Sequence, residues 1–302
     1  MKTIKPEYFD SFKCKADKCV DSCCSAGWQI QVDNNSIAKY CNLKNDFFAD
    51  INNYIQTDNK IKNFKKQNGK CIFLNKGLCS LVEKYGDKYL CDVCRDYPRF
   101  YNFVADVNLK GLSLDCEEVA NLILNNSEPV KFLTNNAKSK DGKLQIKLDL
   151  MFKIIDVLQD RNYDIKQRIN NVFNILNCEK FYNDKNIFNM FNELEWLNFD
   201  GQQLAKYLND KTFDLTFKYT DTVIENLLVY FIYRYFISKN NFNEITKFKF
   251  ALFCTLCCDR MQDFFDINDN EYYEFKSVTT FCRQIEYSTK NVNLIMNFLD
   301  EN

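Results

Sequence analysis

Hydrophobic positions recur at helical spacing through most of the second half of this chain. Apolar side chains stand at i, i+1, i+4, i+5 and i+8 over residues 150–158, and a similar stripe runs over 165–176. Residues three and four positions apart share one face of a helix. The pattern therefore predicts helices in both places. It predicts more of them over four further ranges, namely 193–208, 221–238, 243–260 and 280–299.

The first 125 residues show shorter and more mixed patterns. Trp28, Ile30 and Val32 alternate with polar residues, which indicates a short strand. An apolar stripe over 47–55 predicts a helix, because its members fall at helical spacing. The basic, polar segment 62–70 predicts an exposed loop.

Glycines mark the next predicted turns. Gly77 stands between two short apolar pieces and indicates a tight turn. A helix over 78–85 is expected to end at Gly86, because glycine readily takes the left-handed conformation found after helices. Alternating apolar residues over 100–114 predict a hairpin with Gly111 near its turn.

A helix is also expected after Cys116. Asp115 and Glu118 have the spacing of a capping box, in which two side chains satisfy the first free N–H groups of a helix. The polar stretch 125–142 that follows is the best candidate for a domain boundary. We therefore expect a cysteine-rich metal-binding module over 1–125 and an α-helical domain over 126–302. The predicted fold is mainly α, with short strands in the module, which packs against the helical C-terminal half.

Composition narrows the range of partners. The 302 residues are 46% hydrophobic, which is typical of a globular protein. A formal net charge of −1 gives no general attraction to nucleic acid or to an anionic membrane. The N-terminus lacks the apolar core of a signal peptide, and the longest apolar run, 227–237, is broken by Arg234. We expect a soluble, cytoplasmic protein that binds neither nucleic acid nor membrane.

The chain has fifteen cysteines and no histidine, so any metal chemistry must rely on thiolates and carboxylates. Ten of the cysteines lie between positions 14 and 116, in runs of the form C-x4-C-x3-C-C, C-x7-C and C-x2-C. In a reducing cytosol such an array favours metal binding over disulfides. Four thiolates suit either tetrahedral zinc or an iron–sulfur cluster, and the spacing leaves both open.

Some cysteines have a simpler interpretation as small buried apolar side chains. This interpretation applies to Cys41 and Cys91. Cys91 and Cys94 also have the spacing of a redox pair, although no βαβ pattern surrounds them. Core packing is favoured more strongly for the later cysteines, which are Cys178, Cys254, Cys257, Cys258 and Cys282.

Several motifs of the first 125 residues together carry a family resemblance. They are the double cysteine Cys23-Cys24 followed by Gly27-Trp28, the run from Cys71 to Cys79, the run Cys94-Arg-Asp-Tyr-Pro-Arg99, and the segment from Leu112 to Ala120 around Cys116. In this combination the chain resembles the flagellin lysine-N-methylase family.

The resemblance implies transfer of a methyl group from S-adenosylmethionine to lysine side chains of flagellin or of another lysine-bearing protein. It also implies a cysteine-held metal centre, a [4Fe–4S] cluster or, as the alternative, zinc. The candidate ligands are the eight cysteines that fall on family motifs: Cys14, Cys19, Cys23, Cys24, Cys71, Cys79, Cys94 and Cys116.

Residues beside these cysteines are candidates for the reaction itself. Methylation requires a neutral amine held in line with the methyl donor, and Tyr97, Asp115 and Glu118 are candidates to accept its proton or orient it. Trp28 and Arg99 are candidates to bind the cofactor, although packing and a structural ion pair explain them as well. No glycine-rich cofactor loop occurs. One hypothesis is that a cluster iron ligates the amino-acid end of the cofactor.

Two other functions stay open at this point. The chain could be a non-catalytic metalloprotein whose helical half binds a partner protein. It could also be a redox sensor or electron carrier. Methyl transfer to purified flagellin would distinguish the enzyme from both.

Overall fold

The computed structural model describes residues 1–43, 50–135, 138–178, 190–197, 199–209, 211, 214–265 and 272–301. These segments are mainly α-helical, with short strands in the first 135 residues, so the predicted fold class is confirmed. Within them, no helix is both long enough and apolar enough to cross a lipid bilayer.

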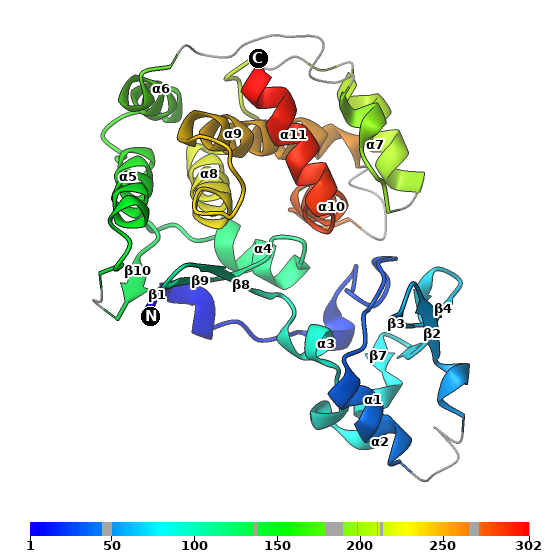
Figure 1. Cartoon of the computed structure of the whole chain (residues 1–302). Helices are drawn as coiled ribbons and strands as arrows, with labels where there is room; N and C mark the ends of the chain where they lie inside the picture. The colour runs from blue at the N-terminus through cyan, green and yellow to red at the C-terminus, as the bar shows by residue number, and fades with distance from the viewer. Residues whose placement is uncertain are drawn as a thin grey trace.

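The helices of the second half form the main body of the molecule (Figure 1). They are α5 (Gly142–Leu158), α6 (Ile165–Leu176), α7 (Phe199–Asn209), α8 (Asp221–Tyr235), α9 (Glu244–Arg260), α10 (Lys276–Glu286) and α11 (Thr289–Glu301). The single helix predicted over 280–299 is wrong, because two helices occupy this range. Ser288 separates them, and its hydroxyl accepts a hydrogen bond from the N–H of Asn291 at 3.3 Å in the first turn of α11.

A four-stranded sheet lies beneath these helices in the view of Figure 1. Its strands, in spatial order, are β10 (Phe132–Thr134), β1 (Lys2–Pro6), β9 (Val107–Leu112) and β8 (Arg99–Val104). The predicted hairpin is confirmed as β8–β9, but its turn is at Ala105 and Asp106. Gly111 instead lies under the ring of Phe100, where a Cβ atom would come within 2.2 Å of ring carbon.

The first half also contains short helices and strand pairs. The helices are α1 (Asn34–Cys41), α2 (Ser80–Tyr85), α3 (Asp92–Asp96) and α4 (Glu117–Leu124). The two-stranded pairs are β2 (Ile55–Asp58) with β3 (Ile61–Phe64), β4 (Lys66–Gln67) with β5 (Lys70–Cys71), and β6 (Leu74–Asn75) with β7 (Leu78–Cys79). The predicted turn at Gly77 and the helix end at Gly86 are confirmed, and both glycines have positive φ.

Three local predictions for this region need correction. The strand predicted over 28–32 is a single bridge between Gln31 and Asn63. Most of the loop predicted over 62–70 belongs to strands β3, β4 and β5. Asn59 and Lys60 adopt the positive φ of a tight turn and form the β2–β3 hairpin, and Asn68 and Gly69 do the same between β4 and β5. Of the helix predicted over 47–55, residues 47–49 lie outside the described residues. The remainder forms one 3-10 turn and the start of β2.

Buried hydrophobic residues gather into two clusters. The larger one joins β1, β9 and α4 to the helices of the second half. The smaller one lies under the cysteine-bearing loops and consists of Ile30, Val32, Tyr40, Ile55, Phe64, Phe73, Leu81 and Cys91. A domain boundary near residue 125 stays a prediction.

Candidate functional site

Three thiols from two loops form a contacting group, which we call the thiol triad: Cys23, Cys24 and Cys71. The thiol of Cys24 lies in the middle and shares hydrogen bonds with both neighbours. The backbone fixes the same contact, because Cys71 N–H donates to the carbonyl of Cys24 at 2.9 Å. The bond to Cys24 lowers the pKa of Cys71 to about 7 and also lowers that of Cys23, while the pKa of Cys24 is raised.

A second thiol pair lies close to the triad. Cys91 and Cys94 share a side-chain hydrogen bond that lowers the pKa of Cys91 and raises that of Cys94. Cys94 also lies within electrostatic range of Cys23 and Cys71. Cys91 is fully buried, as predicted, but Cys41 is exposed, so its interpretation as a core residue is wrong.

Backbone N–H groups point at several of these sulfur atoms. The N–H groups two and three residues further along the chain lie near the sulfur atoms of Cys71, Cys79 and Cys116 and act to lower the pKa of these thiols. Cys14 accepts a hydrogen bond from the N–H of Ala16 at 3.4 Å. Such bonds stabilise a thiolate over a thiol. Burial nevertheless raises the pKa of Cys79 and raises that of Cys116 to about 12, so at these two thiols the N–H groups only partly offset the effect of burial.

The outer cysteines are connected through a buried carboxylate that the sequence analysis missed. Glu117 is 3% exposed and pairs with Lys15 at 2.6 Å. Glu117 also accepts a hydrogen bond from the N–H of Asp21 at 3.1 Å. These contacts tie the loop that carries Cys14 and Cys19 to the start of α4. Glu118, the predicted candidate, is more exposed and lies 3.6 Å from Lys15.

The described thiols are grouped without surrounding a common point. Among the residues that the structure describes, no three cysteine, aspartate or glutamate side chains are arranged so that they could hold a metal ion. The donor chemistry is nevertheless that of a thiophilic site, since five thiols lie in two neighbouring groups and histidine is absent.

Arg283 of α10 joins two of the cysteine loops. Its guanidinium forms an ion pair with Asp21 and donates to the carbonyl of Asp115 at 3.0 Å. Asp21 precedes the Cys23-Cys24 pair and Asp115 precedes Cys116, so one buried side chain holds both loops against the helical body. The Arg283 charge also contributes to the lowered pKa of Cys23. Its Nε is buried and has no hydrogen-bond partner among the described residues.

Three of the predicted site residues come together beside Arg283. The rings of Trp28 and Tyr97 pack edge to face at 5.4 Å, and the Arg283 guanidinium lies 5.8 Å from the ring of Trp28. The hydroxyl of Tyr97 donates to the Asp115 carboxylate at 3.2 Å. Burial raises the pKa of Tyr97 well above its ordinary value, and the Asp115 charge adds to this, so Tyr97 is a hydrogen-bond donor. The other predicted cofactor residue, Arg99, instead lies over Phe9 and Phe12, at 5.8 and 5.2 Å from their ring centres.

The capping role predicted for Asp115 and Glu118 is wrong. Helix α4 begins after Cys116 without a side-chain cap. The Asp115 carboxylate accepts from Tyr97 instead, and its side chain is buried at the junction with α10. A capping box requires the first residue to lie at the helix end, whereas here a tertiary contact takes that carboxylate.

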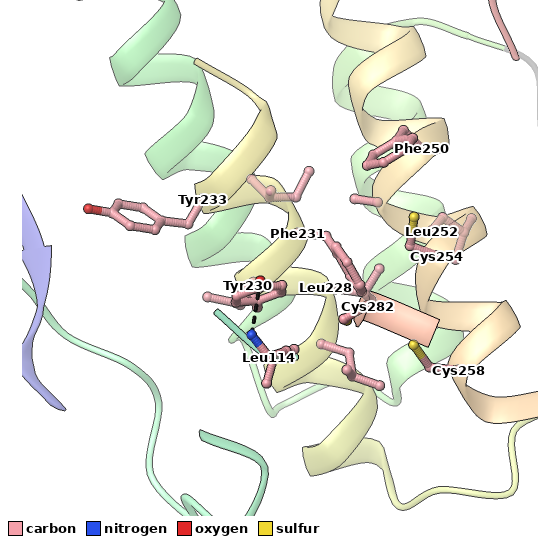
Figure 2. Close-up of a cluster of buried hydrophobic side chains, with 14 of the residues drawn as sticks. Leu114, Leu228, Tyr230, Phe231, Tyr233, Phe250, Leu252, Cys254, Cys258 and Cys282 are labelled. Carbon is pink, nitrogen blue, oxygen red and sulfur yellow. Dashed lines mark hydrogen bonds between the residues drawn. The ribbon is translucent and has the colours of Figure 1, made fainter. Parts of the chain in front are cut away.

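A buried polar network lies behind this junction. Glu286 of α10 accepts hydrogen bonds from Tyr230 and Tyr235, each at 2.9 Å, and pairs with Arg234 at 3.3 Å. The hydroxyl of Tyr230 also accepts the N–H of Leu114 at 3.1 Å, the dashed contact in Figure 2. The segment just before Cys116 is thus held by α8 and α10. Burial raises the pKa of Glu286, although the Arg234 charge opposes this effect.

The cysteines of α9 and α10 are core residues, as predicted. Cys254, Cys257, Cys258 and Cys282 are all fully buried. Figure 2 shows Cys254 and Cys258 near the apolar side chains of α8 and α9, such as Phe231 and Leu252. Burial raises the pKa of Cys254 and Cys282 well above the ordinary value, so these side chains stay neutral.

Comparison with known proteins places the chain in a family. The flagellar biosynthetic protein FliU of Salmonella muenchen is 31% identical over 137 residues, which cover 41% of this chain and 78% of FliU. The chain belongs to the FliU and lysine-N-methylase family. Lysine-N-methylases of Salmonella typhimurium and Salmonella choleraesuis are each 28% identical over 137 residues. The match covers 33% of the length of each methylase.

The family resemblance seen in the sequence is thereby confirmed. No family model matches the chain, and no solved structure matches it. Within the FliU and lysine-N-methylase family, the thiol triad, Arg283 and the Trp28–Tyr97–Asp115 contact are the features of this chain that call for a functional explanation.

Proposed function

We propose that this chain is a protein-lysine N-methyltransferase that acts on flagellin, uses S-adenosylmethionine as the methyl donor and holds a cysteine-ligated metal centre. The observation that carries the proposal is the convergence of family membership with a buried junction of thiols, Arg283, Tyr97 and Asp115. The names of the relatives supply the reaction and its flagellar target. The junction supplies side chains that could carry out the reaction.

The thiol chemistry of the junction supports a thiophilic metal centre, whereas its described side chains do not surround a common point. Cys23, Cys24 and Cys71 already touch, and Cys94 lies within electrostatic range of the first and third. The unpaired Nε of Arg283 offers a further donor to negative charge in a buried place. We propose these four cysteines as the inner ligands of a [4Fe–4S] cluster, with zinc as the alternative. If only three of these cysteines held the cluster, the remaining iron would supply a Lewis-acid position for the amino-acid end of the methyl donor.

The chain's own residues account for the handling of the substrate amine. A lysine ammonium must lose a proton before its nitrogen can attack the methyl group. Asp115 is the best-placed acceptor, because Tyr97 donates to it and Arg283 holds its backbone carbonyl. Tyr97 orients this carboxylate. Trp28 lies against Tyr97 and offers an aromatic face for the cationic sulfonium of the cofactor.

Two measurements on protein purified without oxygen test this proposal. The first is iron, zinc and acid-labile sulfide per chain, with the visible spectrum. About four irons and four sulfides indicate a cluster, whereas zinc without sulfide indicates a thiolate zinc site. The second is transfer of labelled methyl from S-adenosylmethionine to purified flagellin. Folded, metal-loaded protein that transfers no methyl group would refute the enzymatic assignment and favour a structural or redox metalloprotein.

A further inference from the structure

An open groove lies between the edge strand β10 and helix α5, on the opposite side of the molecule from α1–α3 (Figure 1). Its volume is about 600 Å³. Apolar side chains form its floor, among them Phe132, Phe152 and Ile155. Phe132 packs edge to face on Phe152 with ring centres 5.4 Å apart. The groove therefore offers an aromatic surface that is open to a ligand.

The strand beside the groove has a free edge. β10 pairs with β1 in antiparallel register, with Lys5 opposite Leu133. Two hydrogen bonds flank this pairing: Glu7 N–H donates to the Lys131 carbonyl at 2.9 Å, and Asn135 N–H donates to the Thr3 carbonyl at 3.4 Å. The backbone groups of Lys131 and Asn135 therefore face β1. Antiparallel pairing alternates, so the N–H and C=O groups of Phe132 and Thr134 point away from β1. None of the described residues hydrogen-bonds to these outward groups.

Charge is unevenly placed along this groove. Glu128 and Asp156 line the groove together with Gln159, whose side chain bonds to the backbone of Val130, and with the neighbouring Lys131. Lys2 lines the groove as well, and its position in β1 places it beyond the Ile4–Thr134 pair. Glu128 lies within electrostatic range of Arg161, which pairs with Glu225. Among the described residues Asp156 has no ion-pair partner, so the groove offers this carboxylate next to an apolar floor.

We propose that this groove binds an extended, lysine-bearing segment of a protein substrate, which adds as a further strand to β10 and places a lysine ammonium beside Asp156 and Glu128. The outward backbone groups of Phe132 and Thr134 would hold the segment. Alternate side chains of the segment would point toward α5, where the aliphatic stem of a lysine can lie on Phe152. The choice of lysine rests on the proposed function, whereas the strand edge and the acidic residues rest on geometry alone.

The test is fluorescence anisotropy with a short labelled peptide that alternates threonine and valine around one central lysine. A matched peptide carries norleucine, an uncharged side chain of similar shape, in place of lysine. The full chain should bind the lysine peptide about threefold more tightly, because an exposed ion pair contributes modestly. Asp156→Asn should abolish this preference. Asp149→Asn, which changes a carboxylate of α5 outside the groove, should leave it intact.

A backbone variant tests the strand edge separately. Thr134→Pro removes an outward N–H without touching the bonds to β1, so both peptides should bind about tenfold more weakly. Equal affinity for the two peptides, equal effects of the two aspartate variants, or unchanged binding by Thr134→Pro would overturn the proposal. Binding without methyl transfer would count only against the proposed function. Methyl transfer without this binding preference would count only against the groove.

Discussion

Replacing Arg283 with glutamine removes the contact that holds two cysteine loops against the helical body. The change eliminates the ion pair to Asp21, which contributes about 1 kcal/mol because Asp21 is partly exposed. It also removes a charged hydrogen bond to the buried carbonyl of Asp115, which contributes about 2 kcal/mol. We expect a loss of about 3 kcal/mol and, for a chain of 302 residues, a fall in melting temperature of about 5 °C.

A matched variant separates this positioning role from general destabilisation. Arg168 is equally buried, pairs with Glu225 at 2.6 Å and donates to the carbonyl of Leu158 at 2.8 Å, and it lies among helices far from the thiols in sequence. Arg168→Gln should therefore cost a similar amount of stability. Only Arg283→Gln should loosen the Cys23 loop.

The assay is the rate of alkylation of Cys23 in the native protein, read by mass spectrometry, alongside thermal melting. The rate is compared at a pH high enough to ionise Cys23 in both proteins, because Arg283 also helps to lower the pKa of this thiol. Under that condition Arg283→Gln should raise the rate at least about tenfold, because more than about 1.4 kcal/mol of the free energy that holds the loop in place is removed. Arg168→Gln should leave the rate unchanged. Equal alkylation rates in the two variants at equal loss of stability would refute the positioning role of Arg283.

Three further predictions use other parts of the chain. Lys247 is 2% exposed and burial lowers its pKa from 10.5 to about 8, so its charge costs folding free energy below pH 8. Lys247→Met should stabilise the protein by about 3 kcal/mol at pH 7 in chemical unfolding, and this gain should vanish as pH rises past the unfolded pKa. Gly111→Ala should cost about 1 to 3 kcal/mol because its Cβ would overlap the aromatic ring above it, whereas Gly142→Ala, with open space around it, should not destabilise. Cys258→Ala should lower the free energy of unfolding by about 1 to 2 kcal/mol but leave the metal content per chain unchanged, whereas Cys71→Ala should reduce the metal content.

The helices were predictable both where side chains repeat at helical spacing and where burial is nearly complete, whereas the start of α7 and the break between α10 and α11 were not predicted. In α5 and α6 the apolar stripe predicted the helix correctly. In α8 and α9 nearly every side chain is buried, so the apolar residues extend around the whole helix and no stripe marks its inner face. The hairpin β2–β3 escaped prediction because its turn uses Asn59 and Lys60, and positive φ at a lysine has no clear sequence signal.

The candidate site was predictable only in its local part. Motif spacing identified the cysteines, and proximity along the chain suggested Tyr97 and Asp115, which do contact each other. Arg283 could not be found in this way, because it reaches Asp115 across 168 positions and lies in no motif. Glu118 was predicted instead of Glu117, because the spacing of a capping box does not indicate which carboxylate pairs with Lys15, about a hundred positions earlier in the chain.

The central claim is that the chain transfers methyl groups to lysine, and mass spectrometry of flagellin tests it most directly. Purified flagellin would be incubated with S-adenosylmethionine and protein prepared without oxygen, and its lysines would then be mapped. The account predicts added methyl groups on lysine that disappear with Cys71→Ala and fall strongly with Asp115→Asn. Unmodified flagellin after incubation with folded, metal-loaded wild-type protein would contradict it.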